Sequence, residues 1–564
     1  MKKGQIVSGT VKEVRFPNVG IAECEEGEVL VKNVLPGQKV ECRIQKKRQG
    51  KFQGQLLAIT EPSADEAKSP CPHFGQISGC GGCNYQTLPY EKQLQLKQEQ
   101  LRRIFSGVCP DFDQVFEGIL QSPKQYEFRN KMEFSFGDAF KDGPLSLGMH
   151  KRGSFYDIVT VDECRIVDAD FRMILRAVLD FAQKKELRFY HRMRQEGYLR
   201  HLLVRKAAAT GEILVGLVTT SRWQEEGKNG SEKEMLQEFS DMLCKLFDND
   251  TNSAGRGRLT GVIHIVNDAI ADVVQNDRSE ILYGTDHFYE KLCGLTFQIS
   301  PFSFFQTNSF GAEVLYQKAR ECCSDYVNQN GQPVIFDLYS GTGTIAQLMA
   351  PVAEKVVGVE IVEEAVEAAK ENADLNGLHN CEFIAGDVLK VIDTIDEKPD
   401  LIILDPPRDG IHPKALPKIL AYGVQQIVYI SCKPTSLARD LEIMQAAGYV
   451  VKRICSVDMF PGTVHVETVV LLGWKDVDEY IYIDYAPDHR NTTRGKATYR
   501  EIIEYIKKQY GVKVSTLDVA QIKDKCGVEK RENYNKGAEG HFVPQCQPEK
   551  EKLIREAFKH FNLI

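Results

Sequence analysis

The strongest constraint on the fold of this chain is a series of hydrophobic runs between Val334 and Leu472 that alternate with helical stretches. Four of these runs read VIFDLYS, KVVGVEI, PDLIILDPP and QIVYIS. Strands that alternate with helices are typical of a doubly wound parallel sheet, and ligands bind such sheets outside the carboxyl ends of the strands. We therefore expect an α/β domain over residues 296–474, with its functional residues gathered at one edge of the sheet.

The ends of three runs carry residues suited to a nucleotide-like cofactor. DLYSGTGTIAQ leaves a strand and turns through Gly341 and Gly343 into a helix, which lets the backbone approach a ligand closely. Glu360 ends the next strand, where a carboxylate can accept hydrogen bonds from ribose hydroxyls, and Asp405 ends a later one. In this order the three ends resemble the Rossmann-like site with which class I methyltransferases bind S-adenosylmethionine; another nucleotide-binding sheet is the alternative.

Cys432 stands in IVYISCKPTSLARDL, directly after a strand and before a helix, at the same expected edge. A lone cysteine in such a place is more often buried and inert than reactive. Here the wider motif SCxPxxLARDL, with QISPFSFFQTN upstream and DMFPGTVHVETVVLL downstream, resembles the RNA uridine-5-methyltransferase family.

This resemblance implies covalent catalysis. Carbon 5 of uracil is a poor nucleophile until a thiolate adds to carbon 6, and a base must later remove the carbon 5 proton. The family pattern assigns the nucleophile to Cys432 and the base to Glu467, with His465 as an alternative base. It also implies that S-adenosylmethionine is contacted by four residues, namely Gln306, Tyr339, Glu360 and Asp405.

Four further cysteines form a second motif. CPHFGQISGCGGC contains Cys71, Cys80 and Cys83, and Cys164 stands in VDECRIVD. Four thiolates suit either an iron-sulfur cluster or a structural zinc ion, and the spacing alone does not choose between them. Members of the family with this pattern hold a [4Fe-4S] cluster, usually with a shorter gap between the first two cysteines. The resemblance therefore implies such a cluster, in a structural or RNA-positioning role.

The rest of the chain divides into three expected units. Residues 1–60 alternate β-branched and polar residues, carry eleven Lys and Arg against six Asp and Glu, and resemble a TRAM domain, a small OB-like RNA-binding β-barrel. Residues 61–295 hold the cysteine motif and an α+β central RNA-binding domain, and residues 475–564 form a helical extension without evident chemistry. Candidate RNA contacts in the central domain, with a solvated strand face as the alternative, are Arg129, Asn130, Lys131, Arg200 and Arg205.

The composition restricts the partner and the compartment. A net charge of -8 requires any RNA site to be a local basic patch. Sixteen cysteines spread over 564 residues, the absence of a long apolar stretch and a start without an apolar signal core predict a cytoplasmic protein without a membrane segment. No obligate protein partner is expected.

The basic barrel and the cysteine motif favour 23S ribosomal RNA as the substrate, with transfer RNA as the alternative. A non-catalytic RNA-binding factor is a second alternative, against which intact Cys432, Glu467 and Asp405 argue. A DNA cytosine-5 methyltransferase would place its nucleophile directly after a proline, and the nearest such sequence, Pro544 to Cys546, lies outside the sheet. An amino-group methyltransferase could use DPPR, but it needs no cysteine.

Overall fold

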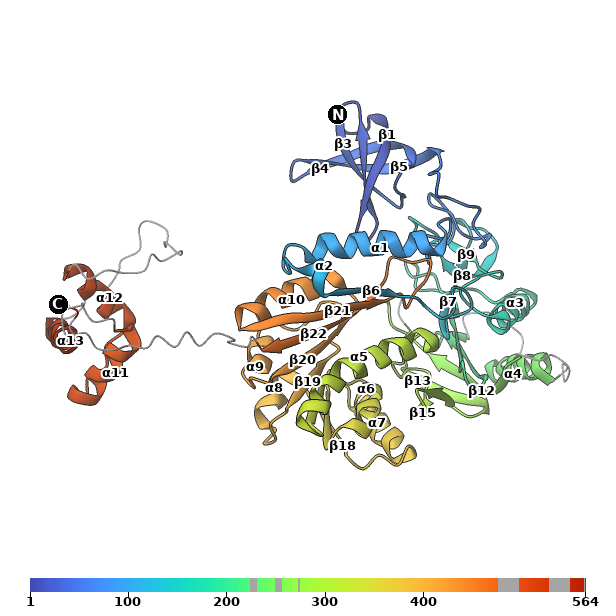
Figure 1. Ribbon diagram of the computed structural model, residues 1–564. Coiled ribbons are helices and arrows are strands. Elements are labelled where there is room, and N and C mark those ends of the chain that lie inside the picture. Colours follow the sequence, from blue (N-terminus) through green and yellow to red (C-terminus); the bar gives the residue numbers. More distant parts are fainter. Residues whose placement is uncertain are drawn as a thin grey trace. The chain divides into compact units, whose positions relative to one another are not determined.

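The computed structural model describes residues 1–223, 231–248, 256–271, 274–474, 497–526, 548–561 and 563 (Figure 1). The chain divides into two compact units, residues 1–476 and 477–564. No helix among these described residues is long and apolar enough to cross a membrane.

The first five strands form a closed barrel, in the order β1-β2-β3-β5-β4. Its core is built by alternation: Val40, Cys42 and Ile44 point inward from one strand, while their neighbours face outward. The expected small N-terminal barrel is therefore present. Its strands are β1 (Ile6–Arg15), β2 (Val19–Cys24), β3 (Gly27–Lys32), β4 (Lys39–Arg48) and β5 (Lys51–Glu61).

The central part of the chain contains a seven-stranded sheet, ordered β13-β12-β11-β10-β7-β8-β9. Helices α3 (Ala169–Lys184) and α4 (Glu232–Asp248) cover one of its faces, where Phe171, Ile174 and Phe239 are buried. A two-stranded sheet, β14 (Phe288–Leu292) and β15 (Leu295–Ile299), follows. The seven strands are β7 (Lys131–Asp138), β8 (Leu145–His150), β9 (Ile158–Thr160), β10 (Leu199–Lys206), β11 (Glu212–Thr219), β12 (Arg258–Val266) and β13 (Arg278–Gly284).

An eight-stranded sheet, ordered β18-β17-β16-β19-β20-β22-β21-β6, forms the α/β part. Successive residues of one strand face opposite layers: Ile335 packs in one hydrophobic cluster with α5, α6 and α7, and Phe336 packs in another with α1, α9 and α10. Helices thus cover both faces, as expected for a doubly wound sheet. The strands are β6 (Phe116–Leu120), β16 (Val334–Leu338), β17 (Lys355–Glu360), β18 (Cys381–Ala385), β19 (Leu401–Leu404), β20 (Gln426–Ser431), β21 (Tyr449–Val457) and β22 (Glu467–Trp474).

The helices of this part complete the two layers. One layer contains α5 (Ser309–Asn330), α6 (Thr344–Met349) and α7 (Glu363–Leu375), and the other contains α1 (Tyr90–Phe105), α9 (Leu416–Leu420) and α10 (Pro434–Ala446). Short helices are α2 (Phe112–Val115), α8 (Val388–Val391) and two 3-10 turns, Ala350–Val352 and Ile392–Thr394.

Two features of this sheet correct the sequence-based expectation. The sheet is not wholly parallel, because β22 runs antiparallel to both β20 and β21. A parallel connection needs a crossover of about a dozen residues or more, and the link from Val457 to Glu467 is too short for one. In addition, α1 and β6 fall within residues 61–295 but belong to this sheet, since β6 pairs with β21 and α1 buries Leu101 against it.

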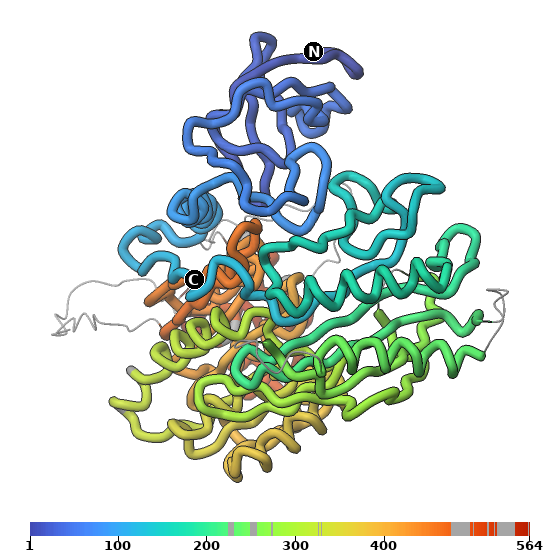
Figure 2. The backbone as a smooth tube through the Cα atoms, turned by 90° about the vertical axis from the view of Figure 1, so that its right-hand side faces the viewer, coloured from blue at the N-terminus to red at the C-terminus, as the bar shows by residue number. Residues whose placement is uncertain are grey.

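Helix α1 lies between the barrel and the α/β sheet (Figures 1 and 2). It meets the barrel through Gln100, whose side-chain amide donates to the carbonyl of Val14 at 3.2 Å. It meets the sheet layer through contacts with α10. The helix thus joins the barrel to the part of the chain that carries the strand-end residues.

The second unit has a hydrophobic core of its own. Helices α11 (Tyr499–Tyr510), α12 (Thr516–Lys525) and α13 (Pro548–His560) pack together through Ile502, Ile522 and Phe558. Thr498 and Glu501 form a reciprocal capping box at the start of α11. The described part of the C-terminal extension is therefore helical, as expected.

Candidate active site

Cys432 and Glu467 lie at the same edge of the α/β sheet. Strands β20 and β22 pair antiparallel, and the last pair in their register is Ser431 with Thr468. Cys432 directly follows Ser431, Glu467 directly precedes Thr468, and the carboxyl of Glu467 is close enough to raise the pKa of the Cys432 thiol. The unexpected direction of β22 therefore brings together two residues that are 35 positions apart in the sequence.

The thiol of Cys432 lies in an acidic setting. Its pKa is raised to about 11 by burial first and by the carboxyls of Glu467 and Asp405, and Arg408 acts in the opposite direction. Burial also raises the pKa of Glu467 to about 8, with help from Asp405 and opposition from Arg408. Asp405 directly follows β19, and burial raises its pKa to about 7. These three neighbouring groups become negatively charged when they ionise, so each disfavours ionisation of the others. A bound cation would lower all three pKa values.

The loop after β16 is shaped by residues with positive φ. Tyr339, Gly341 and Gly343 have φ values of 70°, 54° and 69°. For a tyrosine this conformation is strained, and such strain is concentrated at functional sites. Glu360 at the end of β17 holds the loop, because its carboxylate accepts a 3.0 Å hydrogen bond from the backbone N–H of Gly341. The same carboxylate accepts a second bond from Val362, also at 3.0 Å.

A buried carboxyl that the sequence analysis did not single out lies beneath this loop. Asp337 is fully buried and accepts a 2.9 Å hydrogen bond from the N–H of Ala346, while its other oxygen has no hydrogen-bond partner in the structure. Burial and Asp405 raise its pKa to about 8. The available signal was an acidic residue inside the hydrophobic run VIFDL.

Gln306 reaches the same region through the segment before α5. Its side chain hydrogen-bonds the hydroxyl of Tyr316, a buried residue of α5 whose pKa is raised by burial and by Asp405 and Glu467. Its carbonyl accepts a 3.0 Å bond from the side-chain amide of Asn130. The structure thus gathers Gln306, Asp405 and Glu467 around Tyr316, a residue that no motif pointed to.

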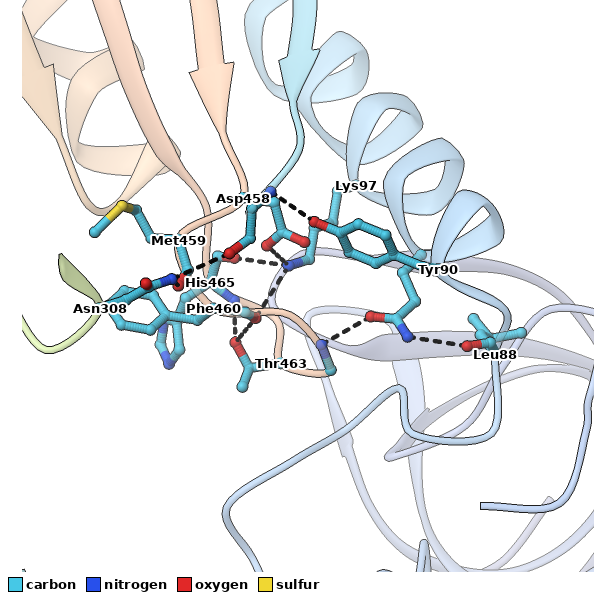
Figure 3. Close-up of polar contacts among 12 residues, drawn as sticks. Leu88, Tyr90, Lys97, Asn308, Asp458, Met459, Phe460, Thr463 and His465 are labelled. Carbon is cyan, nitrogen blue, oxygen red and sulfur yellow. Dashed lines mark hydrogen bonds and ion pairs between the residues drawn. The ribbon is translucent and has the colours of Figure 1, made fainter. Parts of the chain in front are cut away.

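The loop between β21 and β22 is fixed by a buried network centred on Lys97 (Figure 3). The ammonium group of Lys97, on α1, lies 2.6 Å from a carboxylate oxygen of Asp458 and donates to the carbonyl of His465 at 2.8 Å. Gln93, also on α1, accepts a 2.8 Å bond from the N–H of Gly462. Helix α1 therefore holds the loop that immediately precedes Glu467.

His465 lies in this loop, two residues before Glu467. Its pKa is lowered to about 4, by burial first and then by the cations Arg408, Lys97 and Arg129. The imidazole is therefore neutral at physiological pH and a weaker base than the carboxylate of Glu467.

The four cysteines of the second motif line one cavity. Cys71, Cys80, Cys83 and Cys164 share it with apolar neighbours such as Met132 and Ile166. Burial raises the pKa of Cys83 to about 12 and that of Cys164 to about 11, and the other thiols of the set add to both. Two N–H groups point at sulfur, from Gly82 to Cys80 at 3.4 Å and from Gln86 to Cys83 at 3.3 Å. Among the described residues, no group of three or more His, Cys, Asp or Glu is arranged to hold a metal ion.

This cavity is joined to the loop between β21 and β22 through backbone hydrogen bonds. The N–H groups of Asn84 and Tyr85, directly after Cys83, donate to the carbonyl of Gly462 at 2.7 and 2.9 Å. On the other side, the N–H of Arg129 donates to the carbonyl of Ile166, two residues after Cys164. The cysteine loop and the loop before Glu467 are thus in direct contact.

Two of the basic residues proposed as RNA contacts have a structural role. Arg205 is 1% exposed and donates to the carbonyls of Ser300 and Ser303 at 2.7 and 2.8 Å. Arg200 is 4% exposed and likewise donates to backbone carbonyls, among them that of Asn267. The interpretation of Arg205 as an RNA contact is wrong, because its guanidinium is buried and backbone carbonyls satisfy it, and the guanidinium of Arg200 is likewise bound by backbone carbonyls.

The other three candidates flank the active site. Asn130 bonds the carbonyl of Gln306, as above, and the hydroxyl of Ser309 at 2.9 Å. Arg129 is half-buried, and Lys131 pairs with Glu133 at 2.8 Å.

Comparison with known proteins identifies the family of this chain. The family model for tRNA (uracil-5-)-methyltransferase matches residues 89–475. An uncharacterized RNA methyltransferase of Clostridium tetani is 47% identical over 477 residues, which is 84% of this chain and 99% of the relative. One from Bacteroides thetaiotaomicron is 34% identical over 472 residues, covering 80% and 98%.

Among solved structures, the Pyrococcus abyssi tRNA (uracil-54, C5)-methyltransferase in complex with S-adenosyl-L-homocysteine superposes with a TM-score of 0.63. It is 25% identical, and the match covers 82% of this chain and all of that one. The family model and the relatives together show that the chain is an S-adenosylmethionine-dependent RNA methyltransferase and belongs to the tRNA (uracil-5-)-methyltransferase family.

Proposed function

We propose that this enzyme methylates carbon 5 of a uridine in 23S ribosomal RNA through a covalent adduct with Cys432. The observation that carries the proposal is the antiparallel pairing of β20 and β22, because its last pair, Ser431 with Thr468, directly adjoins Cys432 and Glu467, and Asp405 also acts electrostatically on Cys432. An amino-group methyltransferase would have no use for a thiol and a second carboxyl placed in this way.

The two side chains have separate tasks. The thiolate of Cys432 forms a bond to carbon 6 of uracil, which turns carbon 5 into an enolate-like nucleophile. S-adenosylmethionine supplies the methyl group that carbon 5 takes up. Glu467 then accepts the proton from carbon 5, the carbon 5–carbon 6 double bond re-forms, and the sulfur leaves carbon 6 with its electron pair.

Glu467 is the better candidate for the base because its pKa is matched to the task. A general base works best with a pKa near the working pH, and burial raises that of Glu467 to about 8. His465, the alternative, has a pKa lowered to about 4 and lies beside three cations. We therefore assign proton removal to Glu467.

The cofactor is held, in this proposal, by the strand ends and the segment before α5. Glu360 would accept hydrogen bonds from the ribose, and Tyr339 would flank the loop that the ligand enters. Gln306 and Asp405 would lie toward the reacting end of the cofactor, next to Glu467. The acidic character of the pocket supports binding of a ligand whose sulfur carries a positive charge.

For the four cysteines we retain the [4Fe-4S] cluster. Their shared cavity, its apolar lining and the two N–H groups that point at sulfur fit such a cluster. The cluster would hold Cys71, Cys80, Cys83 and Cys164 together and so fix the loop that contacts Gly462.

Purification without oxygen followed by iron and acid-labile sulfide analysis tests the cluster. We expect both elements in the wild type and their loss, with the visible absorbance of the cluster, in Cys83→Ser. Cys244→Ser, on α4 and outside the cavity, is the matched control and should keep both. Zinc in place of iron and sulfide would overturn the assignment.

The choice of ribosomal RNA rests on the N-terminal barrel and the cysteine motif, which we interpret as a TRAM domain and a cluster. Transfer RNA is the second candidate, because the family model and the Pyrococcus abyssi structure carry that name. The test is to incubate the enzyme and S-adenosylmethionine with 23S ribosomal RNA fragments or transfer RNAs that contain 5-fluorouridine. Fluorine cannot leave as a proton, so the adduct accumulates on the true substrate. An adduct with transfer RNA alone would move the assignment, and none with either RNA would favour a non-catalytic RNA-binding factor.

A further inference from the structure

The central sheet carries a second cavity, outside the proposed active site. It lies along β7 and β10 and is bordered by the loops that carry residues 155–156 and 189–192. Its walls are unusually aromatic and basic: they include Phe155, Tyr156, Tyr190, His191 and Arg192. No step of the proposed reaction uses these residues.

Two loops contribute these side chains, and both are basic. Residues 148–157 and 186–196 contain five Lys and Arg against three acidic residues, Asp157, Glu186 and Glu196, and Lys151 pairs with Asp157 at 3.4 Å, in a protein with a net charge of -8. The carboxyl of Asp138 also lines the cavity, where it accepts a 2.9 Å hydrogen bond from the N–H of Asp142. A local basic patch of this kind is what an acidic protein needs in order to attract a polyanion.

The side chains of Phe155 and Tyr156 are largely exposed to solvent, although large aromatic side chains are usually buried in a folded protein. Phe155 is 85% exposed and Tyr156 is 63% exposed, so neither contributes much to the core. Large exposed aromatic groups beside basic residues are typical of surfaces on which unpaired bases stack.

The loop that carries Phe155 and Tyr156 is nevertheless held in place. The side chain of Arg152 donates to the carbonyl of Gly75 at 2.9 Å and to the side chain of Asn33 at 3.1 Å, so the loop is tied to the cysteine loop and the barrel. The N–H of Asp157 donates to Ser154 at 3.1 Å. Opposite, the guanidinium of Arg200 lies 4.8 Å from the ring centre of Tyr190. Because the backbone of this loop is already held, less of it has to become ordered when a ligand binds.

The cavity also lies within reach of the active site. His201 lines it, and Arg205, four residues along the same strand β10, binds the carbonyls just before Gln306. At about 3.3 Å per residue, the two points are about 13 Å apart along the strand. A single strand of a few nucleotides can span that separation.

We infer that this cavity binds an unpaired base of the RNA substrate near the target uridine, stacked against Phe155 and Tyr156, with Arg192 near its phosphate. The inference rests on the proposed function, since it requires an RNA with an accessible single-stranded segment. Because stacking accepts any base, the pocket adds affinity and positions the strand without reading its sequence.

The test uses the full-length enzyme and a single-stranded RNA of mixed sequence that contains 5-iodouridine at positions flanking one 5-fluorouridine. The dissociation constant of this RNA is measured without S-adenosylmethionine for three proteins: the wild type, the double variant Phe155→Ala/Tyr156→Ala, and Arg192→Gln. Phe140→Ala is the matched control, because Phe140 is an aromatic residue of the same domain, 61% exposed, that does not line the cavity.

We expect the dissociation constant to rise about tenfold or more in the double variant, as loss of base stacking requires, and to stay unchanged in the control. Light-induced cross-links should map to the peptide that contains Phe155 and Tyr156. At saturating RNA and S-adenosylmethionine, adduct formation with Cys432 should persist in the double variant. Equal affinities for the double variant and the control, or cross-links confined to other peptides, would overturn the inference.

The experiments test the covalent mechanism and the RNA-binding cavity independently of each other. If the wild type forms no adduct with any fluorinated RNA, the covalent mechanism fails, while the affinities still decide whether the cavity binds RNA. If the adduct forms and the affinities do not change, the mechanism stands and the cavity is not an RNA site.

Discussion

Lys97 and Asp458 form an ion pair whose two side chains are fully buried, although 361 positions separate them in the sequence. The nitrogen and oxygen lie 2.6 Å apart, and Lys97 also donates to the carbonyl of His465. Burial lowers the pKa of Lys97, and Asp458 opposes this effect. The pair connects α1 to the loop before Glu467, so the position of the proposed base depends on a helix encoded far upstream.

Replacement of Lys97 by Met should therefore destabilise the first unit strongly. Removal of one partner leaves the Asp458 carboxylate buried without its cation, which costs about 3–5 kcal/mol. Urea denaturation of the full chain, with the midpoint of the first unit as the readout, measures this loss. Lys92→Met is the matched control on the same helix, because Lys92 pairs with Asp65 at the surface, where a pair contributes about 0–1 kcal/mol. Equal losses in the two variants would contradict the role given to the buried pair.

The carboxyls around the cofactor site predict a pH-dependent effect of ligand binding. The pKa values of Asp337, Asp405 and Glu467 are raised to about 8, 7 and 8. All three exceed the unfolded values of about 4, so their contribution to stability is complete below about pH 4 and is lost as the pH rises through about 7–8.

The melting temperature of the ligand-free protein should accordingly fall from about pH 6 to about pH 9. The increase produced by S-adenosylmethionine should become larger over the same range, because its positive sulfur offsets the ionised carboxylates. S-adenosylhomocysteine lacks that charge and is the control, for which the increase should grow less. Equal increases for the two ligands at every pH would show that charge at the sulfur is not recognised.

The hydroxyl of Tyr316 should contribute to cofactor binding through Gln306. Tyr316→Phe removes the hydrogen bond to that side chain, and one such bond contributes about 0.5–1.5 kcal/mol, or a few-fold to about tenfold in affinity. Calorimetric titration with S-adenosylhomocysteine measures the change. Tyr326→Phe, on the same helix α5, should leave the affinity unchanged. An unchanged affinity in Tyr316→Phe would mean that Gln306 is positioned without the tyrosine.

Much of the catalytic edge could be predicted because it depends on local patterns. Hydrophobic runs that alternate with helices place Glu360, Asp405 and Cys432 at the ends of parallel strands, and those strands are present. The direction of β22 could not be recognised from its own residues, because a fully buried strand has the same hydrophobic pattern whether it pairs parallel or antiparallel. It follows only when the length of the preceding loop is considered.

Contacts between distant segments were beyond sequence reasoning. The periodicity of α1 shows that one face is apolar, but not which sheet that face covers or that Lys97 meets Asp458. In the same way, Arg200 and Arg205 looked like surface charges because the carbonyls that satisfy them come from other segments. The exposed Phe155 and Tyr156 gave no periodic signal, and only the folded chain places them beside His191 and Arg192 in one cavity.

The most direct test of the account is the mass of the species that accumulates in Glu467→Gln with an RNA substrate containing ordinary uridine and S-adenosylmethionine. A glutamine cannot take the carbon 5 proton, so we predict a covalent complex with the mass of the protein plus singly methylated RNA, attached at Cys432. The wild type should release methylated RNA instead, and Cys432→Ala should form neither complex nor product. Full turnover by Glu467→Gln, or methylation of carbon 5 by Cys432→Ala, would contradict the division of labour between these two residues.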